Sequence, residues 1–326
     1  QDSLVPIAGP NSRSFGLHPG MAAEQGGDET ADPTTRGVAG LYNAGNLAFV
    51  ANVGSLVERT TRQTYNERTG LPLGLFSHAD LQRHWQTGFP QSRSQITGWG
   101  GRMADLVLCT ILTPPVSMNI SRGGMNLYQT GGTVVPDAIG TGGATTVNGY
   151  IPGLSGGGRQ NRMFTRAMDN MLDQTYTDLL AKSFAESNRG STDAALSFNA
   201  ATEAIDLTTA FADESPSRQL RMVAEVIGAR DQLQQSRQIF FVSLGGWDNH
   251  AGLLTANNEN LPRVSRALKS LYDAMVELGV QNEVTLFTAS DFARTLGSNG
   301  QGSDHAWGGN QIVMGGGVDG GKIYGD

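Results

Sequence analysis

Two residues that could bind a metal ion follow an apolar run in the second half of the chain. Residues 239–244 read IFFVSL, two glycines come next, and Asp248 and His250 stand just beyond them. Carboxylate and neutral imidazole together select zinc, manganese or similar divalent ions, whereas an oxygen-only set favours calcium or magnesium. The pattern therefore indicates part of a metal site at the end of a buried strand.

Polar residues also border the two later apolar runs, residues 284–289 and 311–314. Asp291 and Arg294 follow the first run, and His305 precedes the second. The residues that we expect to hold one ion, with room left for water or substrate, are Asp248, His250 and His305. Asp291 belongs either to this site or to a second ion beside it, and Arg294 either binds an anionic ester group or pairs with Asp291. Taken singly, the aspartates could be helix caps and His305 a buried histidine, but their shared position on one predicted edge favours the metal.

A second group of residues lies at 75–88, LFSHADLQRHWQTG. Ser77 followed three positions later by Asp80 is a capping box that opens a helix. Capping is sufficient to explain Ser77, yet a helix N-terminus also favours a hydroxyl nucleophile, because its free N–H groups can hold an oxyanion. His78 and His84 flank this position, and a surface or packing role is their default interpretation. Ser77 is therefore the candidate nucleophile.

The elements that would position these side chains can be predicted from hydrophobic periodicity. A helix is expected at 261–278, because apolar residues recur on one face and Gly279 can end it. It connects the apolar strands at 239–244 and 284–289. This order predicts two parallel strands joined by a right-handed crossover. Their carboxyl ends would then meet at the edge where open α/β folds bind ligands.

Other segments complete an α/β pattern. The remaining segments with strand or helix periodicity are strands at 47–53 and 311–314, and helices at 161–188 and from Ser215 onward. Helices that alternate with fully apolar strands predict an α/β/α sandwich with a mostly parallel central sheet. Residues 131–158, in which ten of 28 are glycine, are predicted to form a loop and hairpin insertion. Residues 20–36 are acidic and predict an exposed loop.

Composition narrows the possible partners. The net charge of −7 over 326 residues gives no basic surface for nucleic acid. No apolar run approaches the roughly 20 residues of a membrane-spanning helix. The single cysteine, Cys109, excludes an internal disulfide, and its apolar surroundings predict burial. One cysteine is compatible with the cytosol or with a protein that is exported already folded.

Several ungapped motifs carry a family resemblance. Four segments occur along the chain in this order: FSHADLQRHWQTG, TGWGGR, SLGGWDNH and VTLFTASDFARTLGSNGQGSDHAWGGNQIVMGG. They resemble, in the same order, segments of a family of exported bacterial proteins, domain of unknown function 1501. The chain resembles this family over nearly its whole length. The resemblance implies a single alkaline-phosphatase-like domain spanning 1–326, membership of the alkaline phosphatase and sulfatase superfamily, and export by the twin-arginine route to the periplasm, cell surface or medium.

The resemblance also implies roles for particular residues. In the superfamily, one metal is held by an aspartate and two histidines, and another by two aspartates, a histidine and the nucleophile. The positions that match are Asp248, His250 and His305 for the first metal, Asp291 for the second, and Ser77 for the nucleophile. The histidine expected after Asp291 is replaced here by Phe292. The family's first strand is expected upstream of Gln1, and a C-terminal segment beyond Asp326.

Two functions are consistent with these observations. The first is a secreted, metal-dependent hydrolase of phosphate or sulfate esters. In it, Asp248, His250 and His305 hold a divalent ion, Asp291 supports this ion or a neighbouring one, Ser77 attacks, and Arg294 steadies the anionic substrate. The second is a non-catalytic protein of the cell surface or extracellular matrix that keeps the same fold. Phe292, the glycine-rich segment and the low charged content all suit the second hypothesis.

Overall fold

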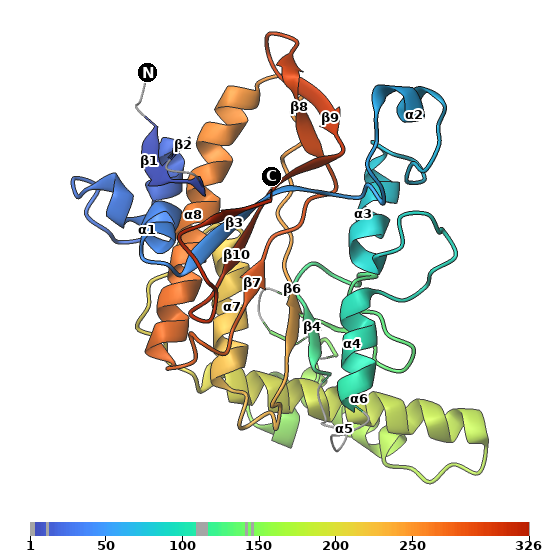
Figure 1. Ribbon diagram of the computed structural model, residues 1–326. Coiled ribbons are helices and arrows are strands. Elements are labelled where there is room, and N and C mark those ends of the chain that lie inside the picture. The colour runs from blue at the N-terminus through green and yellow to red at the C-terminus, as the bar shows by residue number, and fades with distance from the viewer. Residues whose placement is uncertain (1–3, 11–12, 109–116, 141–142, 145–146, 326) are drawn as a thin grey trace.

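The strands of the described chain form four sheets, and the two larger ones have helices on either side of them (Figure 1). Helices α7 (Ser217–Gly228) and α8 (Leu253–Glu277) lie on one side, and α3 (His78–Thr87) and α4 (Trp99–Leu108) on the other. This confirms the mixed α/β class. The computed structural model describes residues 4–10, 13–108, 117–140, 143–144 and 147–325, so the predicted burial of Cys109 lies outside the described residues. Within these ranges no helix is long and apolar enough to cross a membrane.

The main apolar core lies between the four-stranded sheet and helices α1 (Gly37–Asn43), α7 and α8. On α8, Leu268, Leu271 and Met275 recur every three or four residues and are almost completely buried, as helix periodicity predicts. The sheet has the order β11-β3-β10-β7, in which β10 runs antiparallel to both of its neighbours. Its strands are β3 (Leu47–Gly54), β7 (Leu286–Phe287), β10 (Gly308–Met314) and β11 (Ile323–Tyr324).

The second sheet is wholly parallel and has the order β5-β4-β6. Ile120 of this sheet packs with Phe198 and Val226 in a second apolar cluster. Ile139 joins the same cluster, so the glycine-rich segment is anchored to the sheet by a buried side chain. The strands are β4 (Asn119–Ser121), β5 (Asp137–Ala138) and β6 (Ile239–Phe241).

The prediction that the strands at 239–244 and 284–289 are parallel strands of one sheet is wrong. In the described chain β6 pairs only with β4, and β7 only with β10, so the two strands belong to different sheets. β6 also ends early, because the Gln219 side chain bonds both the N–H and the carbonyl of Ser243 in place of a neighbouring strand. One of these two sheets is therefore wholly parallel, and the other is mixed.

Aromatic rings connect the two sheets where backbone hydrogen bonds do not. The Trp99 ring lies 5.5 Å from Phe287 of β7 and 4.7 Å from Tyr128. Tyr128 lies in turn 6.1 Å from Phe241 of β6. Burial raises the pKa of Tyr128 to about 12. These contacts fix α4 against the strand ends and help to hold both sheets in one arrangement.

The helix predicted at 161–188 is two helices, α5 (Arg159–Leu172) and α6 (Leu179–Glu203). The break occurs because Asp178 adopts an extended conformation and its side chain accepts the N–H of Ala181, which starts a new helix. Helix α8 likewise begins at Leu253 rather than at 261. Periodicity identified these helices but placed their ends poorly.

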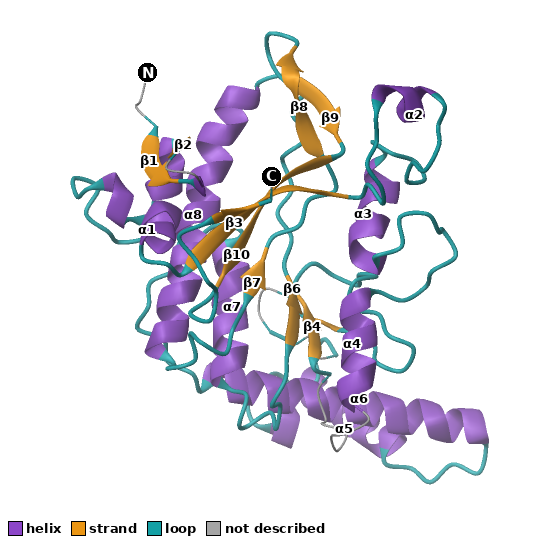
Figure 2. Cartoon of the chain, viewed as in Figure 1, coloured by secondary structure: helices purple, strands orange, loops and turns teal. Residues whose placement is uncertain are grey.

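Short elements complete the fold. Figure 2 shows that the segments after β6 and β7 run to the same end of the molecule, where the β8–β9 hairpin stands. The remaining elements are β1 (Val5–Ala8), β2 (Ser14–Leu17), α2 (Arg62–Asn66), β8 (Ala293–Ser298), β9 (Ser303–Ala306), and the 3-10 helices η2 (Pro19–Ala22), η3 (Pro33–Thr35) and η4 (Pro152–Leu154). The last predicted strand, at 311–314, is the second part of β10.

Candidate metal centre

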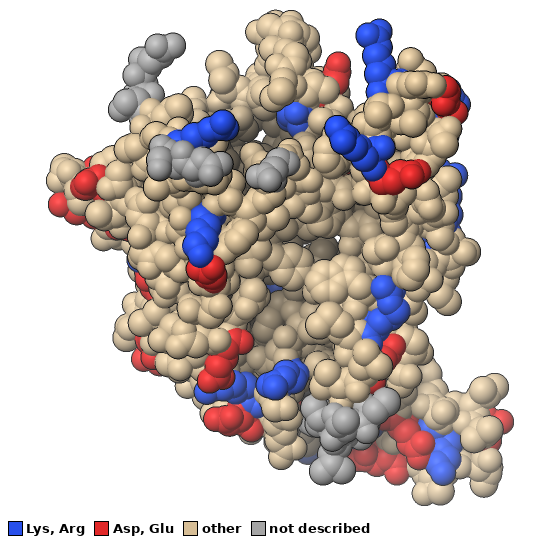
Figure 3. Space-filling model, viewed as in Figure 1, with Lys and Arg blue, Asp and Glu red and all other residues tan. Residues whose placement is uncertain are grey.

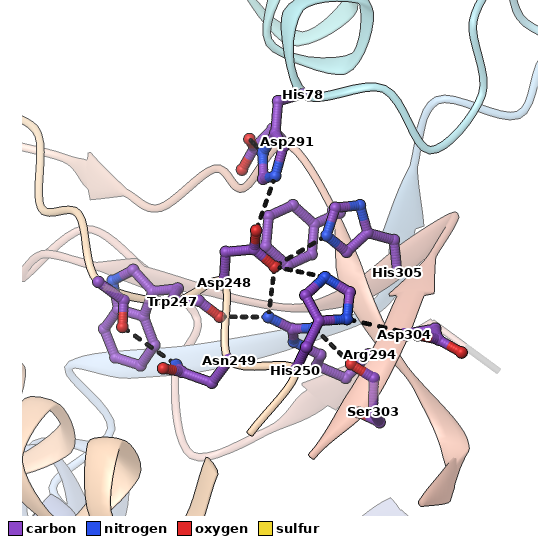
Figure 4. Close-up of polar contacts among 12 residues, drawn as sticks. His78, Trp247, Asp248, Asn249, His250, Asp291, Arg294, Ser303, Asp304 and His305 are labelled. Carbon is purple, nitrogen blue, oxygen red and sulfur yellow. Dashed lines mark hydrogen bonds and ion pairs between the residues drawn. The ribbon is translucent and has the colours of Figure 1, made fainter. Parts of the chain in front are cut away.

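Four elements bring ionisable side chains together at this end of the molecule (Figure 4). Asp248 and His250 stand in the loop after β6, and His78 is the first residue of α3. Arg294 of β8 and His305 of β9 are directly paired across their antiparallel hairpin. Residues that are far apart in the sequence thus converge on one place, which we call the rim cluster: His78, Asp248, His250, Asp291, Arg294, Asp304 and His305.

Asp248 is the centre of the rim cluster. Its Oδ1 lies 2.9 Å from His305 Nε2, 3.0 Å from His250 Nε2 and 3.0 Å from Arg294 Nη2. Its Oδ2 lies 3.2 Å from His78 Nε2. The contact with His305, followed by those with Arg294 and His78, holds the pKa of Asp248 far below its ordinary value. The carboxylate is therefore ionised at any physiological pH.

The three histidines share one arrangement. Each has Nε2 close to Asp248, and each has Nδ1 close to a second oxygen outside the centre. His78 Nδ1 lies 2.7 Å from Asp291 Oδ2, His250 Nδ1 lies 3.4 Å from an oxygen of Asp304, and His305 Nδ1 lies 3.0 Å from the Phe76 carbonyl. Metal-binding histidines commonly have this second contact, because it fixes the tautomer and the ring orientation.

The hydrogen-bond acceptors around His305 and His78 require either additional protons on the two rings or a bound cation. The Phe76 carbonyl can only accept, so His305 Nδ1 carries a proton, and a neutral ring then turns the Nε2 lone pair toward Asp248. His78 stands between two carboxylates, which both accept as well, and the hydrogen bond with Asp291 raises the pKa of His78. Either extra protons or a cation between Nε2 and Asp248 satisfies both rings. The residues present therefore fit a divalent ion.

The atoms that could hold the ion are close together. His78, Asp248 and His305 each offer a ligand atom, and all three atoms lie within 4.8 Å of one another. His250 Nε2, which contacts the same oxygen of Asp248, is a further donor. A set of imidazoles with one carboxylate suits zinc or manganese better than calcium or magnesium.

Two predicted residues lie in the rim cluster with their polar atoms already engaged. Asp291 Oδ2 accepts from His78 and, at 3.2 Å, from Gln82, which places this carboxylate behind the histidine. Arg294 donates to the carbonyls of Ser303 and Trp247 and to Asp248. Asp291 thus orients the His78 ring, and Arg294 holds Asp248 in place.

Ser77 occupies a different position. It is the N-cap residue of α3, but its side chain makes no capping hydrogen bond, so the predicted capping box does not form. Its hydroxyl instead contacts Asp80, whose carboxylate also forms a two-pronged ion pair with Arg93. Among the described contacts, none joins the Ser77 hydroxyl to the residues around Asp248.

Phe292 forms a wall of the rim cluster. Its ring stacks on His305 at 4.0 Å and meets the His78 ring edge-on at 4.9 Å. The Arg294 guanidinium lies over the same ring at 4.9 Å. An apolar side chain therefore fills the place beside Asp291 where the family resemblance predicts a metal-binding histidine.

Sequence reasoning missed His78, which it treated as a surface or packing residue. A signal was present, because His78 directly follows the N-cap position that had been assigned to the nucleophile. His84, by contrast, is buried, and burial lowers its pKa. The packing role that was its default interpretation agrees with this position.

The fold and the site together define a mixed α/β protein with three histidines around one aspartate at the ends of its strands. The chain belongs to the family described as protein of unknown function (DUF1501), which matches residues 3–326. The family resemblance found in the motifs is thereby confirmed. No significant match was found among curated proteins or among solved structures.

Proposed function

We propose that the protein is a divalent-metal-dependent hydrolase of phosphate or sulfate esters that acts outside the cytoplasm. One observation carries the proposal: three imidazoles direct Nε2 at Asp248 while a second oxygen holds each Nδ1. Such contacts contribute little to folding at a solvent-exposed position, whereas they are what a hydrolytic metal site requires.

Some residues of the rim cluster bind the ion, and others hold these ligands in position. The residues that hold the ion are His78, Asp248, His250 and His305. When bound, the ion supplies Lewis-acid polarisation of the anionic ester. Asp291 keeps the His78 ring in its orientation, and Arg294 keeps Asp248 turned toward the three rings. Phe292 excludes water from one side of the cluster, since only 9% of its surface is exposed.

Ser77 is the proposed nucleophile because of its place in the fold. It precedes His78 directly, so its hydroxyl starts from the same helix end as one of the ligands. The free N–H groups of the first turn of α3 can stabilise an anion there. Attack requires the hydroxyl to turn away from Asp80, with which it is in contact.

Turnover can be tested on the metal-loaded protein with aryl phosphates and aryl sulfates. We expect hydrolysis of one of the two classes and a loss of more than ~100-fold in Ser77→Ala. Ser92→Ala is the matched control, because Ser92 is a partly exposed serine whose hydroxyl contacts Ser94. Metal-loaded protein that hydrolyses neither class contradicts the proposal.

A second candidate function is a non-catalytic protein of the cell surface or matrix that binds an ion for structure. Two observations favour it: Phe292 fills the side of the cluster beside Asp291, and two of the three guanidinium nitrogens of Arg294 are taken by fixed oxygens. This alternative predicts that a divalent ion raises Tm while neither ester class is hydrolysed. Fractionation of cells tests the exported location for both candidates.

A further inference from the structure

The hairpin of α5 and α6 exposes an unusual number of large apolar side chains. We call residues 159–193 the arm; its outer end projects from the body beside the base of α4 (Figures 1 and 3). Between 40% and 80% of the surface of six apolar residues is exposed here: Met163, Phe164, Met171, Leu179, Leu180 and Phe184. No other stretch of this length in the described chain exposes as many.

The exposed residues follow helix spacing. Phe164 and Met171 lie two turns apart on α5, and Leu180 and Phe184 lie one turn apart on α6. The inward sides of both helices are already engaged, because Thr165, Leu172 and Ala185 are buried and Arg189 pairs with aspartates of α5. Each helix therefore carries an apolar stripe that no element of the described chain covers.

The charges of the arm distinguish it from the rest of the molecule. The arm holds five basic and five acidic residues, so the whole net charge of −7 lies outside it. Two copies of this acidic protein repel one another over most pairs of faces, but not at their arms. The charges are also separated along α5: Arg159, Arg162 and Arg166 precede Asp173 at its C-cap, a carboxylate that is 65% exposed although it pairs with Arg189.

We propose that the arm binds the arm of a second copy of this chain, in an antiparallel two-fold arrangement that forms a four-helix bundle. Such a pairing places the arginines of α5 of one copy against Asp173 of the other, and it buries the apolar stripes of both. Six side chains that each expose on the order of 100 Å² give a patch of ~600 Å², near the upper limit for a monomer. A standard interface buries ~800 Å² per partner, so this patch supplies most of it.

Sedimentation velocity over a concentration range of about 1–100 µM tests the proposal. We expect a monomer–dimer equilibrium in the wild type, and we expect Leu180→Glu/Phe184→Glu to weaken association by more than ~30-fold. Leu254→Glu is the matched control, since Leu254 of α8 is equally exposed and lies outside the arm. Far-UV circular dichroism and Tm establish that each variant is folded.

A charge reversal tests the antiparallel arrangement separately. Arg166→Glu should weaken the dimer, because a carboxylate at position 166 would then face Asp173 of the second copy. A wild type that stays monomeric throughout overturns the proposal, as does a dimer that Leu180→Glu/Phe184→Glu leaves unchanged. Flotation of the monomer with phosphatidylcholine vesicles would assign the stripes to a lipid surface and would also overturn it.

Discussion

The core around α8 and the rim cluster are built from opposite kinds of contact. In the core, Leu47 and Leu271 are at most 2% exposed and pack within a cluster of apolar side chains. In the rim cluster, the side chains of Asp248 and His78 are 43% and 42% exposed and meet each other through charged or polar atoms. Apolar burial drives folding, whereas exposed ion pairs contribute ~0–1 kcal/mol.

This difference in contacts indicates a different role for each region. Removal of the core would unfold the chain, but removal of the rim cluster would cost the fold little. Four elements nevertheless bring their polar side chains to one point, and five contacts surround the Asp248 carboxylate and the His78 ring. We therefore assign the core to stability and the rim cluster to ligand binding.

The largest expected effect is in the core. Leu271→Ala should lower the free energy of unfolding by about 2–5 kcal/mol, because it leaves a cavity beside α7 and the sheet. Leu254→Ala, on the exposed side of the same helix, should change it by less than ~0.5 kcal/mol. Urea unfolding of both variants measures the difference, and equal values would remove the basis for the comparison.

The next effect concerns the centre of the rim cluster. Asp248→Ala should weaken divalent metal binding by more than ~100-fold while the free energy of unfolding of the metal-free protein stays nearly constant. Titration calorimetry with zinc and urea unfolding in chelator measure the two quantities. If the metal-free variant is strongly destabilised, Asp248 serves the fold and the comparison fails.

A smaller effect is expected for the carboxylate behind His78. Asp291→Ala should weaken metal binding by ~10–100-fold, because the ring loses the acceptor that orients it. Asp291→Asn keeps an oxygen at this position and should recover part of the affinity. The same loss in both variants would indicate a role for the charge itself, as a ligand or as part of a second site.

The smallest expected effect concerns a carboxylate that stabilises the fold. Hydrogen bonds from the side chain of Thr209 and the backbone of Thr208 lower the pKa of Glu277, at the end of α8, to about 2. Because the folded pKa lies below the ordinary value, this stabilisation is present above about pH 4.5 and is lost as the pH falls toward about 2. Glu277→Gln should therefore lower Tm at neutral pH, and the difference from wild type should shrink between about pH 5 and pH 3. A difference that is independent of pH would contradict this assignment.

Much of the rim cluster could be predicted from the sequence, because the end of a predicted strand indicates at which edge of the fold the following residues lie. Asp248, His250 and Asp291 each follow an apolar run, and such runs end at a common edge in α/β folds. The structure brings these residues together with Arg294 and His305. The function of the cluster remains a prediction.

Other features of the fold depend on individual side-chain contacts, which hydrophobic periodicity does not predict. The separation of β6 from β7 follows in part from the Gln219 amide, which bonds Ser243 from a different helix. The break between α5 and α6 follows from a local cap at Asp178. His78 belongs to the cluster because of how α3 lies against β9, and hydrophobic spacing within α3 says nothing about that contact.

The central claim is that three imidazoles and Asp248 hold one divalent ion, and X-ray absorption at the zinc edge tests it most directly. For the zinc-loaded protein we predict a first shell dominated by imidazole nitrogen at about 2.0 Å. The imidazole contribution should fall in His78→Ala and stay unchanged in His18→Ala, which alters a histidine bonded to Asn258 outside the cluster. Failure to bind zinc, or an imidazole shell that His78→Ala leaves intact, would contradict the account.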